Sequence, residues 1–369
     1  MCAWFLLLLA QSYADNLALD HPAIHYSKGP FDDPVARLQR QIESGKTKLD
    51  LTEDGPGYLP SLLQHLGVNV DSQALVFSKT SFQSQKISPR NPRAIYFGDD
   101  VAVGFVRGGE VLELAALDPM QGIVFYTLGA GKITRHDQCL RCHQGPATLG
   151  VPGIFVGSVY PGPTGLPDRS GAIITDHASA FEDRWGGWYV NAAHGEQKDR
   201  ANSVAPDPEE PEKLEPLGRQ KFNANGYLSD VSDIVALMTF EHQTKMTNLI
   251  IRLGWEARMG KDTARGIEAV VDYMLFTGEV PLKEPIEGVS TFTETFPRRG
   301  PRDRQGRSLR DFDLQTRLFR YPLSYMIYSS AFNALPESIR TRIYERIFHR
   351  ASPAVLEILR DTKADFVHR

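Results

Sequence analysis

The residues whose types and spacing are best suited to chemistry lie in one pentapeptide, Cys139-Leu140-Arg141-Cys142-His143. The spacing Cys-x-x-Cys-His is the pattern by which c-type haem is attached to a protein. In that chemistry the two thiols add to the porphyrin vinyl groups as thioethers, and the histidine that follows becomes an axial ligand of the iron. We therefore expect one haem c, covalently bound by Cys139 and Cys142, with His143 as its proximal ligand.

Two cysteines separated by two residues also occur in disulfides, in thiol redox motifs and in zinc sites. A zinc site needs four good ligands, and no second Cys or His pair stands at a suitable spacing. A thioredoxin-like motif belongs at a strand-to-helix turn, whereas residues 144–146, Gln-Gly-Pro, follow this one. The chain has 3 cysteines, and the third is Cys2 in the N-terminal leader. Haem attachment is therefore preferred, with a disulfide or a chance motif as the alternatives.

The leader is a short apolar run over residues 4–10, followed by Ser12-Tyr13-Ala14. Ser12 and Ala14 are small residues at the third and first positions before the break at Asp15, which is typical of a signal-peptidase site. No Lys or Arg precedes the run, so a buried N-terminal strand or helix is the alternative. We predict a signal peptide over residues 1–14 and export to the periplasm, the side of the bacterial inner membrane on which c-type haem is attached. The leader is too short to span a bilayer and no later stretch is long and apolar enough, so a soluble protein without stable membrane insertion is expected.

The overall composition is that of an ordinary globular protein. Hydrophobic residues make up 41% of the chain, which is enough for a sizeable core. The formal net charge of −4 gives no reason to expect a nucleic-acid or membrane-surface partner. The chain is much longer than a minimal electron-carrier cytochrome, and can hold one large domain or two ordinary ones.

Short β-prone runs separated by turn residues dominate the first half of the chain. After two short helical stretches near residues 35–45 and 60–67, these runs cover 94–97, 101–106, 111–117 and 123–128, and later 154–160, 172–175 and 188–191. Gly108-Gly109 is typical of a tight hairpin turn. The pattern predicts an antiparallel meander that leads directly into the haem motif, within a β-rich domain over residues 15–195.

Acidic residues interleaved with prolines over residues 196–220 indicate a solvated linker. Beyond it, residues 221–369 are predicted to form a helical domain that packs on the haem region. Its expected helices cover 229–253, 263–276, 309–318, 325–332 and two stretches opened by Pro336 and Pro353. The predicted fold class is therefore α+β.

The second axial ligand of the iron is sought among histidines and methionines. Met238, His242 and Met246 are four residues apart, so they share one face of a predicted helix. His242 is the candidate for the distal ligand, because a polar imidazole on an apolar face needs a partner. A core histidine bonded to the backbone or to Glu241 is an equally good interpretation, and either methionine could ligate instead.

Further polar groups could serve an iron with an open distal position. His177, Arg184 and His194 flank an aromatic cluster over residues 185–189 and could act on bound oxygen species, or Arg184 could pair with a haem propionate. The alternative is an aromatic core strand. His136, near the motif, could assist a propionate or could simply be an exposed residue. Six arginines over residues 298–310 could dock an acidic partner, although a solvated loop is preferred.

At residues 139–143 the chain resembles c-type cytochromes as a class, which implies haem, export and redox chemistry. The segment from Ser88-Pro89-Arg90-Asn91-Pro92 through the meander to Cys139 is also similar, in pattern, to exported sensor domains with a PAS-like sheet that carry c-type haem late in the fold. We expect a periplasmic mono-haem cytochrome that transfers one electron between redox partner proteins. The alternatives are a haem-dependent oxidoreductase or peroxidase-like enzyme with an open distal site, and a redox or gas sensor.

Overall fold

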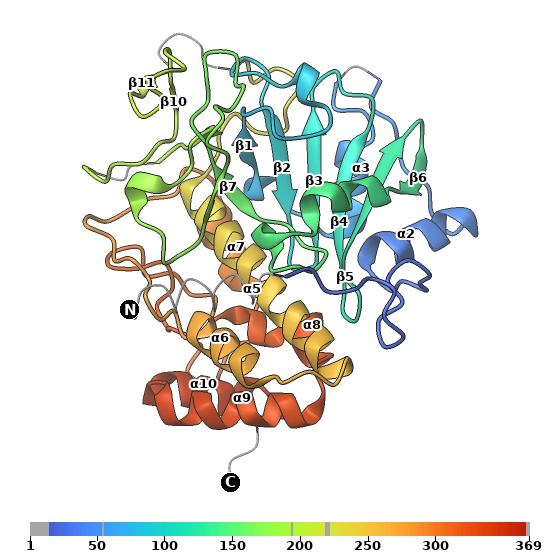
Figure 1. The fold of residues 1–369 in the computed structure, drawn as a ribbon, viewed down its shortest axis with the longest axis vertical. Helices are drawn as coiled ribbons and strands as arrows, with labels where there is room; N and C mark the ends of the chain where they lie inside the picture. Colours follow the sequence, from blue (N-terminus) through green and yellow to red (C-terminus); the bar gives the residue numbers. More distant parts are fainter. Residues whose placement is uncertain (1–14, 54, 193–194, 218–221, 367–369) are drawn as a thin grey trace.

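The structure is a computed structural model that describes residues 15–53, 55–192, 195–217 and 222–366. The predicted signal peptide and His194 lie outside these ranges. The fold is α+β, as predicted: an antiparallel sheet is formed mainly by the first half of the chain, and most long helices lie in the second half (Figure 1).

Seven strands form the main sheet, in the order β6-β5-β4-β3-β2-β1-β9, and each neighbouring pair is antiparallel. The strands are β1 (Ala74–Val76), β2 (Arg93–Phe97), β3 (Val101–Val106), β4 (Leu112–Asp118), β5 (Gly122–Gly129), β6 (Lys132–Arg135) and β9 (Trp188–Tyr189). The predicted meander is confirmed as β2 to β6. Gly108 has a φ of 71° in the β3–β4 turn, a conformation that glycine adopts without a Cβ penalty.

The strand register decides which side chains share a face of the sheet. Ile95, Gly104 and Glu113 are aligned across β2, β3 and β4, and the row formed by Ala102, Ala115 and Phe125 lies beside them. Side chains alternate along a strand, so both rows point to the same side.

The opposite side of the sheet is covered by α2 (Pro34–Glu43) and α3 (Leu59–Leu66), which contact β4 and β3. The Tyr126 hydroxyl on that side donates to Asp33 Oδ2 at 2.6 Å, and the other oxygen of Asp33 caps α2. One buried carboxylate therefore fixes the start of α2 to the sheet.

Helix α5 (Ile234–Arg258) crosses the remaining part of the first face (Figure 1). Asp233 caps its N-terminus by accepting from the amides of Val235 and Ala236. Nearly all of its residues are buried, because the helix packs on the sheet on one side and on α6 (Ala264–Met274) and α8 (Ser330–Asn333) on the others. On the sheet side the rings of Phe240 and Phe97 lie 4.7 Å apart.

The buried apolar side chains form one cluster that extends from Leu17 to Phe366. The β-rich and helical parts predicted from sequence therefore share a hydrophobic core. Between them, residues 196–220 include a small hairpin of β10 (Ser203–Val204) and β11 (Glu215–Pro216), and Ala205 and Leu217 are buried there. That segment packs on the body of the protein more than a solvated linker would.

The helical second half contains one helix that was not predicted, α7 (Phe292–Arg298), and lacks the helix predicted over residues 309–318. The structure contains α6, α7 (Phe292–Arg298), α8, α9 (Glu337–Arg350) and α10 (Pro353–Thr362), together with a 3-10 turn over Tyr325–Tyr328. The predicted helix over 309–318 is wrong: Leu314 has a φ of 59° and Phe312 forms a bridge with Phe319. The Asp313 side chain accepts hydrogen bonds from the backbone amides of Gln315 and Thr316, and these bonds stabilise a turn here instead of a helix.

The arginines of residues 298–310 each face a carboxylate. Arg310 and Arg299 both pair with Asp99 next to β3, and Arg302, Arg304 and Arg307 pair with acidic residues of the second half. These ion pairs attach the loop to the fold, so the loop is neither fully solvated nor a free basic patch.

The shared core predicts the stability of one α5 variant. Leu253 is fully buried, so Leu253→Ala should lower the free energy of unfolding by about 2–5 kcal/mol, through lost apolar burial and the cavity left behind. Leu166 is 62% exposed, and Leu166→Ala should change stability by less than about 0.5 kcal/mol. Denaturant unfolding followed by circular dichroism measures both, and equal effects would contradict the packing described.

Candidate functional site

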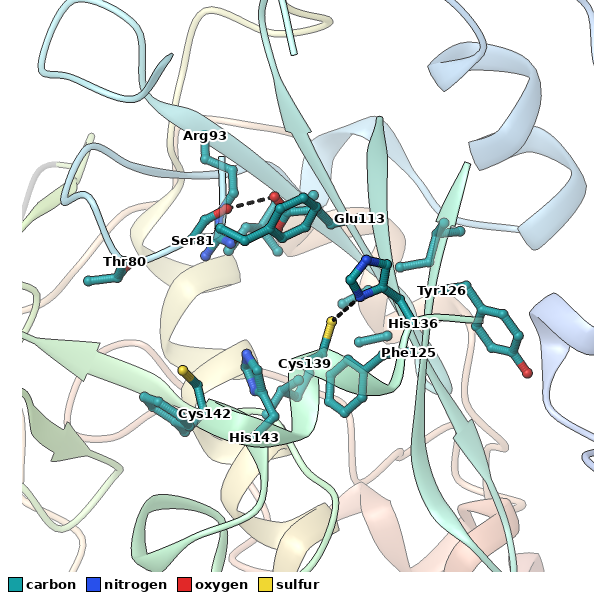
Figure 2. Close-up of a pocket in the computed structure, with 18 of the residues that line it drawn as sticks. Thr80, Ser81, Arg93, Glu113, Phe125, Tyr126, His136, Cys139, Cys142 and His143 are labelled. Atoms are coloured by element: carbon teal, nitrogen blue, oxygen red, sulfur yellow. Dashed lines mark hydrogen bonds and ion pairs between the residues drawn. The ribbon is translucent and has the colours of Figure 1, made fainter. Parts of the chain in front are cut away.

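A cavity of about 410 Å³ lies between the first face of the sheet and the Cys-x-x-Cys-His segment (Figure 2). This volume is within the range of about 300–1,000 Å³ that is usual for ligand and cofactor sites. The residues that line it come from the sheet, the motif with the turn before it, α5, and the loops that contain residues 80–82 and 154–155: Thr80, Ser81, Phe82, Arg93, Ile95, Ala102, Gly104, Glu113, Leu114, Ala115, Phe125, Tyr126, His136, Gln138, Cys139, Arg141, Cys142, His143, Ile154, Phe155 and Phe240.

All three predicted attachment residues line this cavity. The motif folds as one helical turn, α4 (Leu140–His143), which continues a 3-10 turn over Asp137–Cys139. Residues at i, i+3 and i+4 share a helix face, so Cys139, Cys142 and His143 point to the same side. The turn ends where Gln144 becomes extended, two residues before Pro146.

His143 is oriented by a pair of hydrogen bonds to Gly153. Its Nδ1 donates to the Gly153 carbonyl at 2.9 Å, and the Gly153 amide donates to the His143 carbonyl, also at 2.9 Å. A proton on Nδ1 leaves the lone pair of Nε2 available to a metal. The imidazole stands between the rings of Phe125 and Phe155, at 5.0 and 5.7 Å.

The pKa of His143 is lowered from its ordinary value, chiefly because burial penalises the charged imidazolium. The hydrogen bond to Gly153 opposes this effect, and the positive charge of Arg93 adds to it. A neutral imidazole is the form that ligates iron, so the surroundings of His143 favour the ligating state.

Asn248 of α5 supports the loop that holds His143. Its side-chain amide donates to the Ile154 carbonyl at 2.9 Å. A Cβ on Gly153 would lie 2.1 Å from Asn248 Oδ1, so this position has room only for glycine. The helical part of the chain thereby fixes the position of the imidazole.

The two cysteines differ in exposure: Cys139 is half-buried and Cys142 is exposed. Burial raises the pKa of the Cys139 thiol to about 11, and the negative charge of Glu113 adds to the shift. Reactive cysteines of thiol–disulfide enzymes have a depressed pKa instead. The upward shift of the Cys139 pKa therefore disfavours a thioredoxin-like role for the two cysteines.

Across the cavity from the motif stands a polar wall that was not predicted from the sequence (Figure 2). The Arg93 guanidinium pairs with Glu113 Oε2 at 2.9 Å, and both side chains are about four-fifths buried, at 19% and 18% exposure. Glu113 Oε1 accepts from Ser81 Oγ at 2.6 Å and from Gln83 Nε2 at 2.8 Å. Gly104 lies between them on β3, so no side chain separates Arg93 from Glu113.

His136 lies at the side of the cavity near Cys139. Its ring stacks on Phe82 at 5.6 Å, and its Nδ1 is 3.9 Å from Cys139 Sγ. Figure 2 shows it beside Cys139 and to one side of the space between His143 and the polar wall.

His242, the predicted distal ligand, does not line this cavity. It is completely buried, with Nδ1 3.0 Å from His177 Nδ1 and Nε2 2.7 Å from Ser324 Oγ. Both ring nitrogens are thus engaged inside the helical core, as in the core-histidine interpretation. Met238 and Met246 are buried apolar side chains of the same helix. The structure therefore does not bring His242 together with Cys139, Cys142 and His143.

Of the residues considered for an open distal site, His177 and Arg184 lie in a second buried cluster around His242, and His194 lies outside the described residues. Arg184 pairs with Glu241 at 3.3 Å and donates to the His177 carbonyl at 3.0 Å. The ring of Tyr273 stacks on His177 at 4.0 Å. This cluster is separate from the residues that line the cavity.

Comparison with protein-family models, with curated proteins and with solved structures found no match to this chain. Within the described ranges, no three or more His, Cys, Asp or Glu side chains are grouped so that they could hold a metal ion by themselves. No helix of the described part of the chain is both long and apolar enough to cross a bilayer.

The support of His143 by Asn248 predicts the effect of a methyl group at Gly153. Gly153→Ala should lower the free energy of unfolding by about 1–3 kcal/mol, because the new Cβ overlaps Asn248. In an Asn248→Ala background the same change should cost much less. Denaturant unfolding of both singles and the double gives the coupling, and strictly additive costs would contradict the described packing.

The buried histidine pair predicts a loss of stability in mild acid. Burial lowers the pKa of His177 to about 4, with Asp176 opposing this shift. The unfolded chain, with a His pKa of about 6.5, binds more protons below that pH, so stability falls as the pH drops from 6.5 towards 4. Between pH 7 and pH 5 the His177 contribution is on the order of 2 kcal/mol.

His177→Gln should remove this part of the pH dependence of unfolding. His349→Gln is the matched control, since His349 is exposed on α9. Denaturant unfolding at pH 7 and pH 5 measures the difference for each protein. Identical pH dependence in wild type and His177→Gln would contradict the assignment.

Proposed function

We propose that this protein is an exported mono-haem c-type cytochrome, in which Cys139 and Cys142 hold the haem covalently and His143 is its proximal ligand. The observation that carries the proposal is the convergence of these three side chains on one cavity, with the Nδ1 of His143 committed to the Gly153 carbonyl. A bound haem supplies a one-electron Fe(III)/Fe(II) couple.

The residues of the cavity suit a flat, largely apolar ring with polar substituents. Aromatic surface is provided by Phe125, Phe155 and Phe240. The sheet face beneath it carries no bulky side chains at Ala102, Gly104 and Ala115. Cofactor sites are usually lined in this way, with a few polar groups that set the orientation. The motif therefore lies next to a space that complements the cofactor it implies.

The chemistry of the donor set also supports haem over a disulfide or a redox thiol pair. A disulfide would leave no role for His143, whose orientation and neutral form both suit metal ligation. The raised pKa of the Cys139 thiol is opposite to that of a nucleophilic thiol. Covalent attachment needs two thiols beside the cofactor, and Cys139 and Cys142 both line the cavity in which we propose that the haem lies.

One-electron transfer to a redox partner protein follows as the proposed activity. Arg141 and Cys142 are exposed, so the edge of the cavity at the motif is accessible to a partner. Periplasmic location is part of the same proposal, since haem attachment of this type accompanies export. The predicted leader and the motif support each other in this respect.

The decisive experiment is expression of the full-length chain, with its leader, in a bacterium that attaches c-type haem. We expect one covalent haem per chain, seen in the pyridine haemochrome spectrum and as an added haem mass in the denatured protein. Cys139→Ala and Cys142→Ala should each abolish double attachment, because each thiol forms one thioether. Cys2→Ala is the control and should leave the haem content of the exported protein unchanged.

Absence of covalent haem in the exported, folded wild-type protein would sink the proposal. His143→Ala separates ligation from attachment: both cysteines remain, but the ferric absorption spectrum should change because the proximal ligand is lost. An unchanged spectrum would remove His143 from its proposed role.

A further inference from the structure

The polar wall opposite His143 is the feature of the cavity that haem attachment leaves unexplained. We propose that this wall is a binding site for a small anion at the open coordination position of the iron, with the Arg93 guanidinium as its hydrogen-bond donor. The ligand class is a monovalent anion such as fluoride, azide or cyanide. The inference rests on the proposed function, because it needs the haem of Cys139, Cys142 and His143.

Arg93 has a donor that the protein itself does not use. One terminal nitrogen of its guanidinium is committed to Glu113, and the other has no hydrogen-bond partner among the described residues. Nε is fully enclosed by protein, whereas this second terminal nitrogen is not, so it is the donor that can reach a ligand in the cavity that Arg93 lines.

The position of the guanidinium is fixed by neighbours on the sheet. Glu113 accepts from Arg93, Ser81 and Gln83, so both of its oxygens are occupied by protein donors. Its carboxylate thus orients Arg93 and is not available as an acceptor or iron ligand without breaking these bonds. A preorganised charged donor is the usual means of holding a small anion.

The side chains on this wall are poor iron ligands. Thr80, Ser81, Arg93 and Glu113 occupy it in Figure 2, while His136 lies beside Cys139 and is stacked on Phe82. No methionine is among the described residues that line the cavity. His242, with both nitrogens engaged elsewhere, does not reach it. An exogenous ligand is therefore better placed than a protein side chain to complete the coordination of the iron.

The alternative partner for Arg93 is a propionate of the haem itself. Both partners are anions, but they are distinguished by what changes when Arg93 is replaced. If Arg93 pairs with a propionate, its replacement should change the affinity for every ligand to a similar extent. If Arg93 binds the ligand, its replacement should weaken the binding of anions and leave the binding of a neutral ligand unchanged.

The test titrates the ferric, haem-loaded, full-length protein with sodium fluoride and sodium azide, followed by the absorption spectrum at fixed ionic strength. Imidazole, a neutral ligand, is titrated in parallel. Wild type should bind both anions saturably. Arg93→Gln should raise the Kd for fluoride and azide by about 10- to 100-fold, the loss expected for one charge-assisted hydrogen bond, and should change the imidazole Kd less than about threefold.

Arg90→Gln is the matched control, because it removes the same charge from an exposed residue that does not line the cavity. Its anion Kd values should stay within about twofold of wild type. The haem content of each variant, measured by pyridine haemochrome, shows whether it has folded and loaded. If Arg93→Gln fails to load haem, the double variant Arg93→Gln/Glu113→Gln takes its place, because it leaves no buried carboxylate without its partner. Unchanged Kd values for fluoride and azide in that variant would overturn the anion site.

The outcomes separate the two proposals. Lack of covalent haem overturns the proposed function. Covalent haem with a low-spin ferric iron that takes up neither anion leaves the cytochrome intact and overturns the anion site. Equal losses for fluoride and imidazole in Arg93→Gln also overturn the anion site and assign Arg93 to a propionate.

Discussion

Two hydrogen bonds between His143 and Gly153 constrain the rest of the site. One fixes the imidazole through Nδ1 and the other ties the backbone of the motif to the loop that follows. The loop is held in turn by Asn248 of α5, which contacts Ile154 and leaves no room for a Cβ at Gly153. The orientation of one side chain thus depends on a helix about a hundred residues further along the chain.

The side of the cavity opposite His143 is formed by the sheet, and the strand register decides which residues lie there. Gly104 is aligned with Glu113, and the absence of a side chain there lets Arg93 on β2 reach across β3. Apolar rows on the same face carry the aromatic surface beside α5. The cavity therefore has His143 on one side and a charged donor, Arg93, on the other, and the sheet surface between them is apolar. The proposed electron transfer and the proposed anion binding would share this site, since the first would need an attached haem and the second would use a group that attachment leaves free.

A second polar cluster, around His177, His242 and Arg184, lies within the helical core. The polar side chains of this cluster contact one another: His177 contacts His242, and Arg184 pairs with Glu241. Burial disfavours the charged forms of both histidines. This cluster connects α5 with His177 and Arg184 and is separate from the cavity at the motif.

The sequence by itself determined the local features: the Cys-x-x-Cys-His spacing of Cys139, Cys142 and His143, the meander of β2 to β6, and the long helix α5. Each follows from spacing or periodicity over a few residues, so the surrounding fold does not alter it. His242 was predicted as an iron ligand from its place on an apolar helix face, but helix periodicity says nothing about which buried group faces that helix. Arg93 and Glu113 were not predicted; a charged residue in an otherwise apolar strand is the signal that could have found each of them, but only the register of β2, β3 and β4 brings them together. The tertiary structure alone decided which wall faces His143 and that Asn248 supports Gly153, because contacts between residues distant in sequence depend on how the whole sheet and α5 pack.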